Sequence, residues 1–534
     1  MQSRFYIKIT RYKILLLMPL CSISALSIAA DINVETSVAA TAYLYETNTE
    51  ENAATSNHAA VIVPSILASY SSKRLLTSVK IEHTKVEQKN QAEGADKDYT
   101  DYKYNSSLAL IPNTLNIAIS GQQSYRVISQ QQQFIADKVL AAGDLTKYSN
   151  HSGVIDFTIP NPKYFGLNIQ SSYSETKAEE SIEGAAGLNG DNTATSIQLY
   201  QGRNARNYTF NVSAQYNDTS RANFDDFKSS LIRASAGVSI AQNVSFILTG
   251  NIEDNDIDQG TFSRRTNLDS TSYGAGLEWQ PRSERRVRLT YNQLEEVENQ
   301  TNFIGLNLDW AFSNRTALEF DYGKRFYGDA YSLNFSHALK SVRSSLTYSE
   351  QVTSFARLET TTNPIGLFVC QFGSTDLADC FQPDRTTYQL QAGEEFRTLS
   401  EIGSDISEEV IFSKTGSFSL AYQKRKVKAS IRASYNRTEF LESDRVQTNR
   451  NIGLNLSYEL GRKTNIGFST NVARRSSNND ATSDTIINAK VDFNRNINKN
   501  LQVTTGLRFI DRDSEIEGSA IQDRRLTVGL NYTF

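Results

Sequence analysis

The chain ends Arg525-Leu-Thr-Val-Gly-Leu-Asn-Tyr-Thr-Phe534, a stretch in which polar and apolar residues alternate. Side chains of a β-strand point to opposite faces in turn. One face of this stretch therefore carries Leu526, Val528, Leu530, Tyr532 and Phe534. The other face carries Thr527, Gly529, Asn531 and Thr533. The end of the chain predicts a strand with one apolar face, one polar face and an aromatic last residue.

This last strand resembles the terminal signature that the outer-membrane assembly machinery of Gram-negative bacteria recognises. That signature has a final Phe, an aromatic residue two positions earlier and apolar residues at every second position upstream. Phe534 and Tyr532 occupy its two aromatic positions. The alternative is an ordinary closing strand of a soluble β-protein. The resemblance implies an outer-membrane location and the barrel assembly machinery as a partner.

The same alternation recurs from about residue 31 to the end, in segments of roughly ten residues, the length that a tilted strand needs to cross a bilayer. Ile452–Leu460 and Val427–Tyr435 are two clear examples. Charged residues recur on the polar faces, as expected for a water-filled lumen and not for a packed core. The charged candidates for the lumen wall are Arg286, Arg288, Asp309, Glu319, Asp321, Lys428, Arg432, Lys490, Asp492 and Arg508. Aromatic residues that end the apolar faces predict interfacial girdles: Trp279, Trp310, Phe312, Tyr322, Tyr422 and Tyr435.

The breaks between these segments alternate between short and long. Eleven are short, among them Pro112-Asn113 and Ala241–Asn243, and longer charged stretches such as Ile252–Asn267 and Asp511–Arg524 lie between them. Short periplasmic turns that alternate with long outer loops are typical of outer-membrane barrels. With both ends of the chain in the periplasm, eleven short turns predict about 24 strands, within a range of about 20 to 26. We therefore expect an all-β fold, a large up-and-down antiparallel transmembrane barrel.

The first thirty residues have the pattern of a cleaved secretory signal rather than of a folded segment. A basic region with Arg4 and Lys8 precedes an apolar run from Ile14 to Leu26, which small residues follow up to Ala30. This layout is typical of signal peptides, and the apolar run is too short for a spanning helix. We expect residues 1–30 to be the signal and residues 31–534 to form a single barrel. That division leaves no room for a plug domain ahead of the barrel.

The longest irregular stretch, Arg357 to Ser407, is expected to be an extracellular loop. It holds Cys370 and Cys380, the two cysteines outside the signal, and two such residues in an exported chain predict a disulfide. Loops of this length are uncommon unless they are functional or disordered. One interpretation is a constriction folded into the barrel or a binding lid on its surface. The other is a solvated insertion whose disulfide limits proteolysis.

Composition excludes several classes of function. A net charge of -4 without a polybasic patch argues against a nucleic-acid partner. The four histidines, His58, His83, His151 and His337, are scattered, and none lies with further cysteines at the spacing of a metal site. His83 follows Glu82 and His151 precedes Ser152, so adjacent strand positions would direct each pair to opposite faces. We expect no enzymatic activity, no cofactor and no metal.

Several stretches are similar to the large outer-membrane proteins associated with PEP-CTERM protein sorting and exopolysaccharide systems. The stretches that carry the resemblance are Val61–Tyr70, Leu346–Thr353, Glu409–Lys414 and Ser419–Arg425. They cover strand patterns rather than catalytic motifs. The resemblance implies an outer-membrane barrel with a link to exopolysaccharide, and it carries over no catalytic residue.

Two functions fit these features. In the first, the barrel is a channel or an export-associated pore for polar molecules, exopolysaccharide among them, with a periplasmic export component as a partner. The mixed signs of the inner charges argue against strong ion selectivity. In the second, it is a surface protein without a channel, whose loops bind or anchor extracellular polymer or a partner. In both, it is embedded in the lipids of the outer membrane of a Gram-negative bacterium.

Overall fold

The computed structural model describes most of the chain from Asp31 to Phe534. The described segments are 31–49, 55–89, 97–127, 145–179, 189–205, 207–221, 226–257, 269–282, 284–295, 300–325, 327–354, 363–371, 380–381, 394–401, 410–440, 446–477, 482–515 and 520–534. Residues 1–30, the expected signal, lie outside them. The described residues contain no helix long and apolar enough to span a membrane.

The strands of the main sheet are long and antiparallel, and each pairs with the next along the chain, except that β17 pairs with β21. Their bounds in the first half are β1 Asp31–Thr49, β2 Thr55–Ser71, β3 Leu75–Lys89, β4 Lys97–Ile111, β5 Leu115–Val127, β6 Leu145–Thr158, β7 Phe165–Ala178, β8 Gly190–Gln201, β9 Tyr208–Arg221, β10 Phe227–Ala241, β11 Val244–Ile257, β12 Ser270–Arg282 and β13 Arg285–Glu295. Those in the second half are β14 Gln300–Ser313, β15 Thr316–Arg325, β16 Gly328–Ala338, β17 Val342–Ser354, β18 Asn363–Gln371, β19 Cys380–Phe381, β20 Glu394–Glu401, β21 Val410–Lys424, β22 Val427–Phe440, β23 Val446–Gly461, β24 Thr464–Ser477, β25 Thr482–Asn496, β26 Leu501–Ser514 and β27 Ile521–Thr533.

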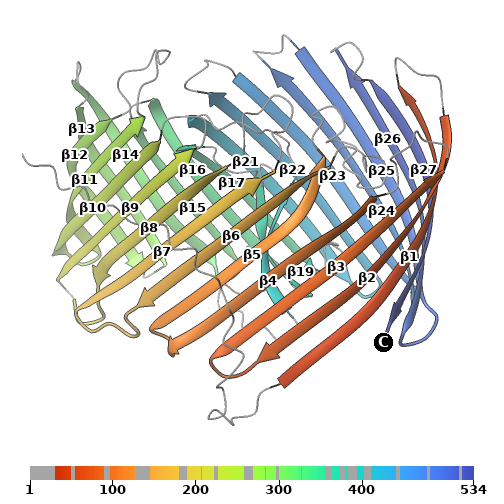
Figure 1. The fold of residues 1–534 in the computed structure, drawn as a ribbon. Helices are drawn as coiled ribbons and strands as arrows, with labels where there is room; N and C mark the ends of the chain where they lie inside the picture. Colours follow the sequence, from red (N-terminus) through yellow and green to blue (C-terminus); the bar gives the residue numbers. More distant parts are fainter. Residues whose placement is uncertain are drawn as a thin grey trace, which may run out of the picture.

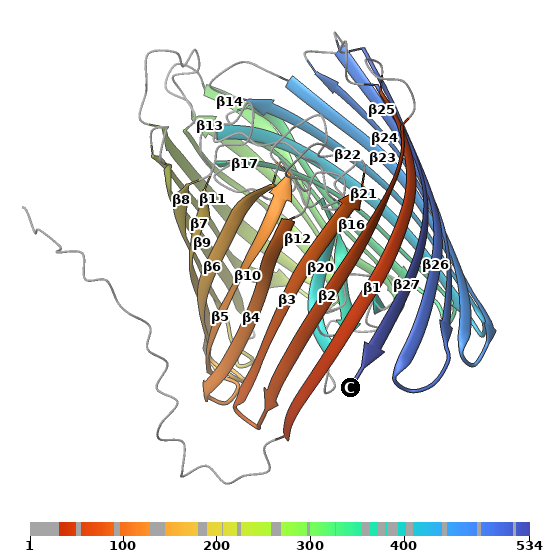
Figure 2. The same ribbon diagram turned by 45° about the vertical axis from the view of Figure 1, so that its right-hand side comes forward.

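Strands β1–β17 and β21–β27 form one sheet of 24 strands. The sheet is closed, because β1 pairs with β27 from Ser37↔Thr533 to Thr49↔Ile521. Figures 1 and 2 show the result, a wide tilted barrel whose first and last strands lie side by side. The predicted fold class and the expected strand number are both confirmed.

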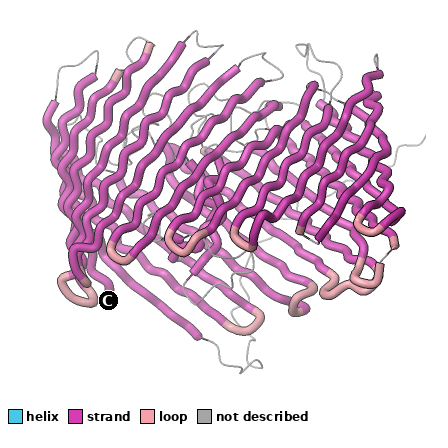
Figure 3. The backbone as a smooth tube through the Cα atoms, turned by 180° about the vertical axis from the view of Figure 1, so that it is seen from behind, coloured by secondary structure: helices cyan, strands magenta, loops and turns pink. Residues whose placement is uncertain are grey.

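The short turns gather at one end of the barrel (Figure 3). Asn113, Asn161 and Asn243 adopt positive φ angles in three of them, a conformation that Asn tolerates better than most residues. The C-terminus and the start of β1 lie at the same end (Figure 2). We call this the turn end and the opposite one the loop end. In outer-membrane barrels the end with the short turns faces the periplasm.

The outer face of the wall is apolar and has an aromatic residue at each border. On β7, Phe165 and Tyr173 are 54% and 49% exposed, with Ile169 between them. On β9, Tyr208 and Tyr216 have the same spacing. Eight residues of a tilted strand rise by about 20 Å, close to the height of the apolar band of an outer-membrane barrel. The described strands are longer than the segments expected from the sequence, because they continue past this band toward the loop end.

The region from Arg357 to Ser407 is not wholly irregular, which corrects the expectation from its sequence. It contains a second sheet of three strands in the order β19-β18-β20. Its alternation is hard to recognise because Pro364 lies next to a register shift in β18. In Figures 1 and 2 these strands (teal) lie within the outline of the barrel, and β18 is beside β21 and β22.

The register of this sheet places the two cysteines opposite each other. Cys370 on β18 and Cys380 on β19 are direct partners. Partners in an antiparallel pair have Cα atoms about 4.5 or 5.5 Å apart, which is compatible with a disulfide. The disulfide itself stays a prediction.

Deleting Phe534 is expected to lower the fraction of correctly assembled barrel. Its backbone N–H donates to the carbonyl of Thr36 at 2.9 Å, and its ring packs edge-on against Tyr532 at 4.9 Å. The deletion removes a bond of the closing strand pair and an exposed aromatic anchor. The measurement is the amount of heat-modifiable protein in the membrane fraction, with Phe534→Tyr as the control that keeps the ring. An unchanged amount after deletion would contradict the role assigned to this residue.

Candidate functional site

One contact identifies the inner face of the wall. The Arg325 side chain of β15 reaches Glu253 of β11, although β12, β13 and β14 lie between them in the sheet. A side chain can bridge strands so far apart only across the inside of a closed wall. Because directly paired residues of neighbouring strands lie on the same face, the register carries this assignment around the barrel.

All ten charged candidates from the sequence share the face of Arg325 and Glu253. Arg286 pairs with Asp309, Asp309 with Glu319, and Asp321 lies two residues beyond Glu319. Arg288 lies two residues from Arg286 on β13. On the other side of the barrel, Lys490 pairs with Arg508, and Asp492 is two residues from Lys490. Lys428 and Arg432 are paired with Ser457 and Gly453 on β23.

The two faces of the wall differ sharply in character. On β27, the apolar residues Leu526, Val528 and Leu530 are exposed on the outside, whereas Arg525 on the inside is buried. The same division runs around the closed sheet. A closed wall with an apolar outer face and a charged inner face is suited to a bilayer, where lipid covers the apolar side chains and no backbone group is left unpaired at a sheet edge. The protein is an outer-membrane β-barrel.

No protein-family profile matches the chain, and neither does any curated protein. Among solved structures, the barrel is similar to the FrpB iron transporter from Neisseria meningitidis (TM-score 0.45, 9% identity, covering 94% of this chain and 82% of that one). It is also similar to the siderophore receptor PirA from Acinetobacter baumannii (0.43, 8%, 94% and 81%) and from Pseudomonas aeruginosa (0.38, 9%, 93% and 80%).

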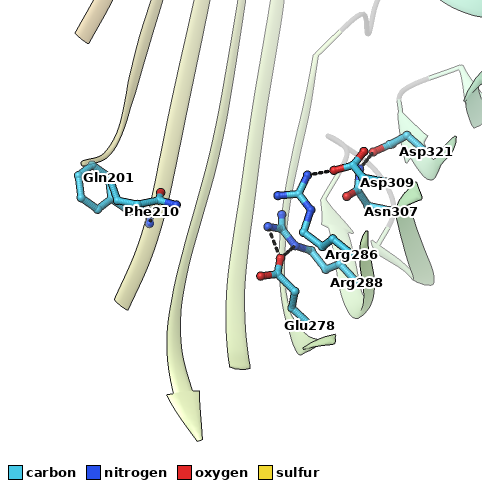
Figure 4. A network of polar contacts seen from close by, with 8 residues as sticks. All are labelled: Gln201, Phe210, Glu278, Arg286, Arg288, Asn307, Asp309 and Asp321. Carbon is cyan, nitrogen blue, oxygen red and sulfur yellow. Dashed lines mark hydrogen bonds and ion pairs between the residues drawn. The ribbon is translucent and has the colours of Figure 1, made fainter. Parts of the chain in front are cut away.

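A row of polar contacts crosses the inner face from β12 to β16, and we call it the polar ladder. Arg288 of β13 donates to Glu278 of β12 at 2.8 and 3.0 Å. Arg286, two residues away, pairs with Asp309 of β14. Figure 4 shows these two arginines beside each other, each bonded to its own carboxylate.

The polar ladder continues through amides. Asn307 of β14 donates to Asp321 of β15 at 2.9 Å, and Asn334 of β16 donates to Glu319 of β15 at 3.1 Å. Every strand from β12 to β16 thus gives a polar group to its neighbour. The polar ladder holds two arginines and four carboxylates along one stretch of wall, so it can contact a polar solute through groups of both signs.

The outer part of the β15–β16 hairpin, its tip, is separate from both neighbouring strands. The pairing of β14 with β15 stops at Leu306↔Tyr322, and that of β16 with β17 stops at Leu333↔Tyr348. The two strands of the hairpin still pair with each other up to Arg325↔Gly328. Within the described residues the tip therefore has no backbone pairing with β14 or β17, and it can lean into the lumen.

Two contacts hold the tip in place. Arg325 donates through Nε to Glu253 at 2.7 Å and also through Nη2, and the two side chains are only 13% and 2% exposed. Tyr327 packs its ring on Phe412 of β21 at 4.2 Å and accepts a hydrogen bond from Arg325 at 3.2 Å. Burial raises the pKa of Tyr327 to about 12, so the phenol stays neutral beside the arginine. We call these contacts the tip latch.

Sequence reasoning missed both ends of the tip latch. Glu253 lies in the stretch from Ile252 to Asn267 that was expected to be a loop, whereas β11 continues to Ile257. A signal for this longer strand was present in the sequence, because polar and apolar residues still alternate from Leu248 to Glu253.

The stretch Asp511–Arg524 was also expected to be a loop and is likewise mostly strand, since β26 ends at Ser514 and β27 begins at Ile521.

Three of the histidines contact hydroxyl groups of neighbouring strands. His83 hydrogen-bonds Thr100 at 2.9 Å, His151 hydrogen-bonds Tyr104 at 3.0 Å, and His337 hydrogen-bonds Thr316 at 2.8 Å. Thr100 and Thr316 are the direct cross-strand partners of His83 and His337, whereas Tyr104 and His151 are separated by strand β5. Within the described segments, no group of three or more His, Cys, Asp or Glu residues is placed to hold a metal ion.

Proposed function

We propose that this outer-membrane barrel is a transport channel for polar molecules whose lumen is narrowed from the loop end. The observation that carries the proposal is the inner wall itself. Charged and amide side chains face inward across the whole polar ladder, and the opposite wall presents Lys490, Asp492 and Arg508. A barrel that only anchors loops has no need of such a wall, which a packed or plugged interior would bury at a cost.

Two structures narrow the lumen in this proposal. The first is the tip of the β15–β16 hairpin, which the Arg325–Glu253 contact of the tip latch draws inward. The second is the β18–β20 sheet beside β21 and β22. Inward-facing Ile411 and Phe440 form a direct pair near the loop end, and each is only 2% exposed. Such low exposure is expected if other segments of the chain cover the pair from the lumen side.

Planar-bilayer recording of the purified barrel tests the proposal. We expect discrete conductance steps that grow with salt concentration and show only weak selectivity between K⁺ and Cl⁻, because the inner wall as a whole contains both signs of charge. Heat-unfolded protein is the control. If neither the whole chain nor a variant lacking residues 357–407 conducts, the channel function is excluded, and a role in binding surface polymer becomes the better account.

Export of an exopolysaccharide, with a periplasmic export component as a partner, is the finer form of this proposal. Its supports are the hydroxyl and amide groups of the inner wall and the resemblance found in the sequence. Surface polymer should decrease in cells that lack the barrel. An unchanged amount of surface polymer would exclude the export of exopolysaccharide but not the channel function.

A further inference from the structure

The turn end of the barrel is rich in lysine and arginine. Three of its eleven short turns each hold two adjacent cations: Lys73-Arg74, Arg425-Lys426 and Arg462-Lys463. Five others each hold one among their described residues: Lys163, Arg203, Arg315, Lys340 and Lys499. We call these residues the basic rim. They occur around the circumference, from the turn between β2 and β3 to the turn between β25 and β26 (Figure 3).

The protein itself does not neutralise the basic rim. All of its side chains are exposed, and none of them forms an ion pair within the described residues. Lys463 Nζ donates to the backbone carbonyl of Ile497 at 3.3 Å, which leaves its charge in place. The described residues of the eleven turns contain one carboxylate, Glu284.

The opposite end of the barrel has the opposite charge in its sequence. The connection between β1 and β2 contains Glu50-Glu51, and the connection between β9 and β10 contains Asp225-Asp226. The chain as a whole has a net charge of only -4. This small total conceals a molecule that is positive at the turn end and acidic at the loop end.

The basic rim lies at the border of the apolar band. Phe165, the aromatic border residue of β7, is 54% exposed and follows Lys163 by two residues. Leu460 of β23 is 51% exposed and precedes Arg462 by two residues. Two residues of a strand span about 7 Å, and the long stems of Lys and Arg reach along such a border. The charges therefore lie at the level of the lipid headgroups.

We infer that the basic rim binds the headgroups of anionic phospholipids in the periplasmic leaflet. Lysine and arginine donate charge-assisted hydrogen bonds to phosphate oxygens. Lipid surrounds a barrel on all sides, as these cations do. Turns of two residues such as Arg425-Lys426 keep their charges beside the wall, where a headgroup reaches them more readily than a periplasmic protein does. The inference goes beyond the proposed function, because it holds whether or not the lumen conducts.

The two tryptophans of the chain are reporters for the lipid at the basic rim. Trp279 and Trp310 lie on the outer face of β12 and β14, each three residues from the last residue of its strand, and their ring centroids are 5.9 Å apart. Exposed arginines flank them, since Arg282 ends β12 and Arg315 lies in the turn after β14. Their fluorescence therefore senses lipid bound at this part of the rim.

Fluorescence quenching of the full chain in phosphatidylcholine vesicles tests the inference. The vesicles contain equal mole fractions of either phosphatidylglycerol or phosphatidylcholine with brominated acyl chains, which quench tryptophan on contact. Phosphatidylglycerol should be enriched beside the tryptophans about fivefold, the effect of one cation close to an anionic surface. The enrichment should disappear in about 1 M salt, where the Debye length falls to about 3 Å.

Two double variants assign the effect to the turn end. Arg282→Gln with Arg315→Gln should abolish most of the enrichment. Arg450→Gln with Arg474→Gln is the matched control and should leave it unchanged. It removes two exposed arginines that pair directly on the outer face of β23 and β24, next to the apolar pair Ile452↔Val472. Arg285 is kept in both, because its guanidinium lies 5.5 Å from the centre of the Trp310 ring and its loss would alter the fluorescence itself.

Three outcomes overturn the inference: equal quenching by the two lipids, enrichment that persists in the turn-end variant, or an equal loss in the loop-end control. Equal quenching would favour an acidic periplasmic protein as the partner of the basic rim. Heat-modifiable mobility confirms that each variant is folded. Because the measurement involves no current, a barrel that does not conduct can still support the inference, and a conducting barrel can still contradict it.

Discussion

Removal of residues 357–407 is expected to raise the single-channel conductance several-fold. The β18–β20 sheet lies within the outline of the barrel beside β21 and β22, so it would occupy part of the cross-section of the proposed channel (Figures 1 and 2). The deletion should leave the wall intact. β17 and β21 pair up to Ser354↔Val410, and the four residues that remain between these ends are enough for a hairpin loop.

Deletion of residues 181–187, between β7 and β8, is the matched control. It shortens another loop-end connection and leaves the β18–β20 sheet in place, so conductance should stay near that of the whole chain. If the deletion of 357–407 conducts like the whole chain, the sheet does not restrict the lumen. The proposal would then keep only the hairpin tip as a constriction.

Breaking the tip latch is expected to free the β15–β16 tip. Glu253→Gln leaves Arg325 largely buried and without its carboxylate, a change that typically costs about 3 kcal/mol or more. Opening of the tip should become about a hundredfold more frequent. Hydrogen exchange of the Gly328–Ser332 backbone amides measures this, because in the described structure these residues pair with β15 and not with β17, so that without the tip latch this end of the hairpin is expected to fray. Current recordings should show more frequent transitions to a larger open level.

Two further variants make the test specific to the tip latch. Glu278→Gln removes an equally buried carboxylate from Arg288, but both residues lie on fully paired strands, so exchange at the tip should not change. The double variant Glu253→Gln, Arg325→Met removes both charges and should recover much of the protection, since no buried charge is left unpaired. Unchanged exchange in Glu253→Gln alone would contradict the tip latch.

Local periodicity was enough to predict the barrel. Alternation in the last strand and the eleven short breaks depend on neighbouring residues only, and they led to the strand number that the structure has. The face of each charged residue follows from the same rule, which is why Lys490 and Arg508 could each be expected on the inside, whereas their pairing is seen only in the structure. Nothing beyond the strand period was needed for these features.

Contacts between distant strands could not be predicted in the same way. Glu253 and Arg325 are 72 residues apart, and their meeting depends on how far the wall bends and on where pairing with β14 and β17 stops. Alternation gives the face of a residue but not the curvature of the sheet.

The junction between β16 and β17 has a mechanical consequence. These strands share six residue pairs, whereas β17 and β21 share thirteen and the closing strands β1 and β27 also share thirteen. Under lateral force the wall should separate first at this junction. It is also the natural position to divide the polypeptide, because fragments ending and beginning between Ala338 and Val342 would each keep their hairpins whole. Such fragments, with 16 and 8 strands of the wall, could reassemble in a bilayer as two parts of one cylinder, each carrying its own tag or probe.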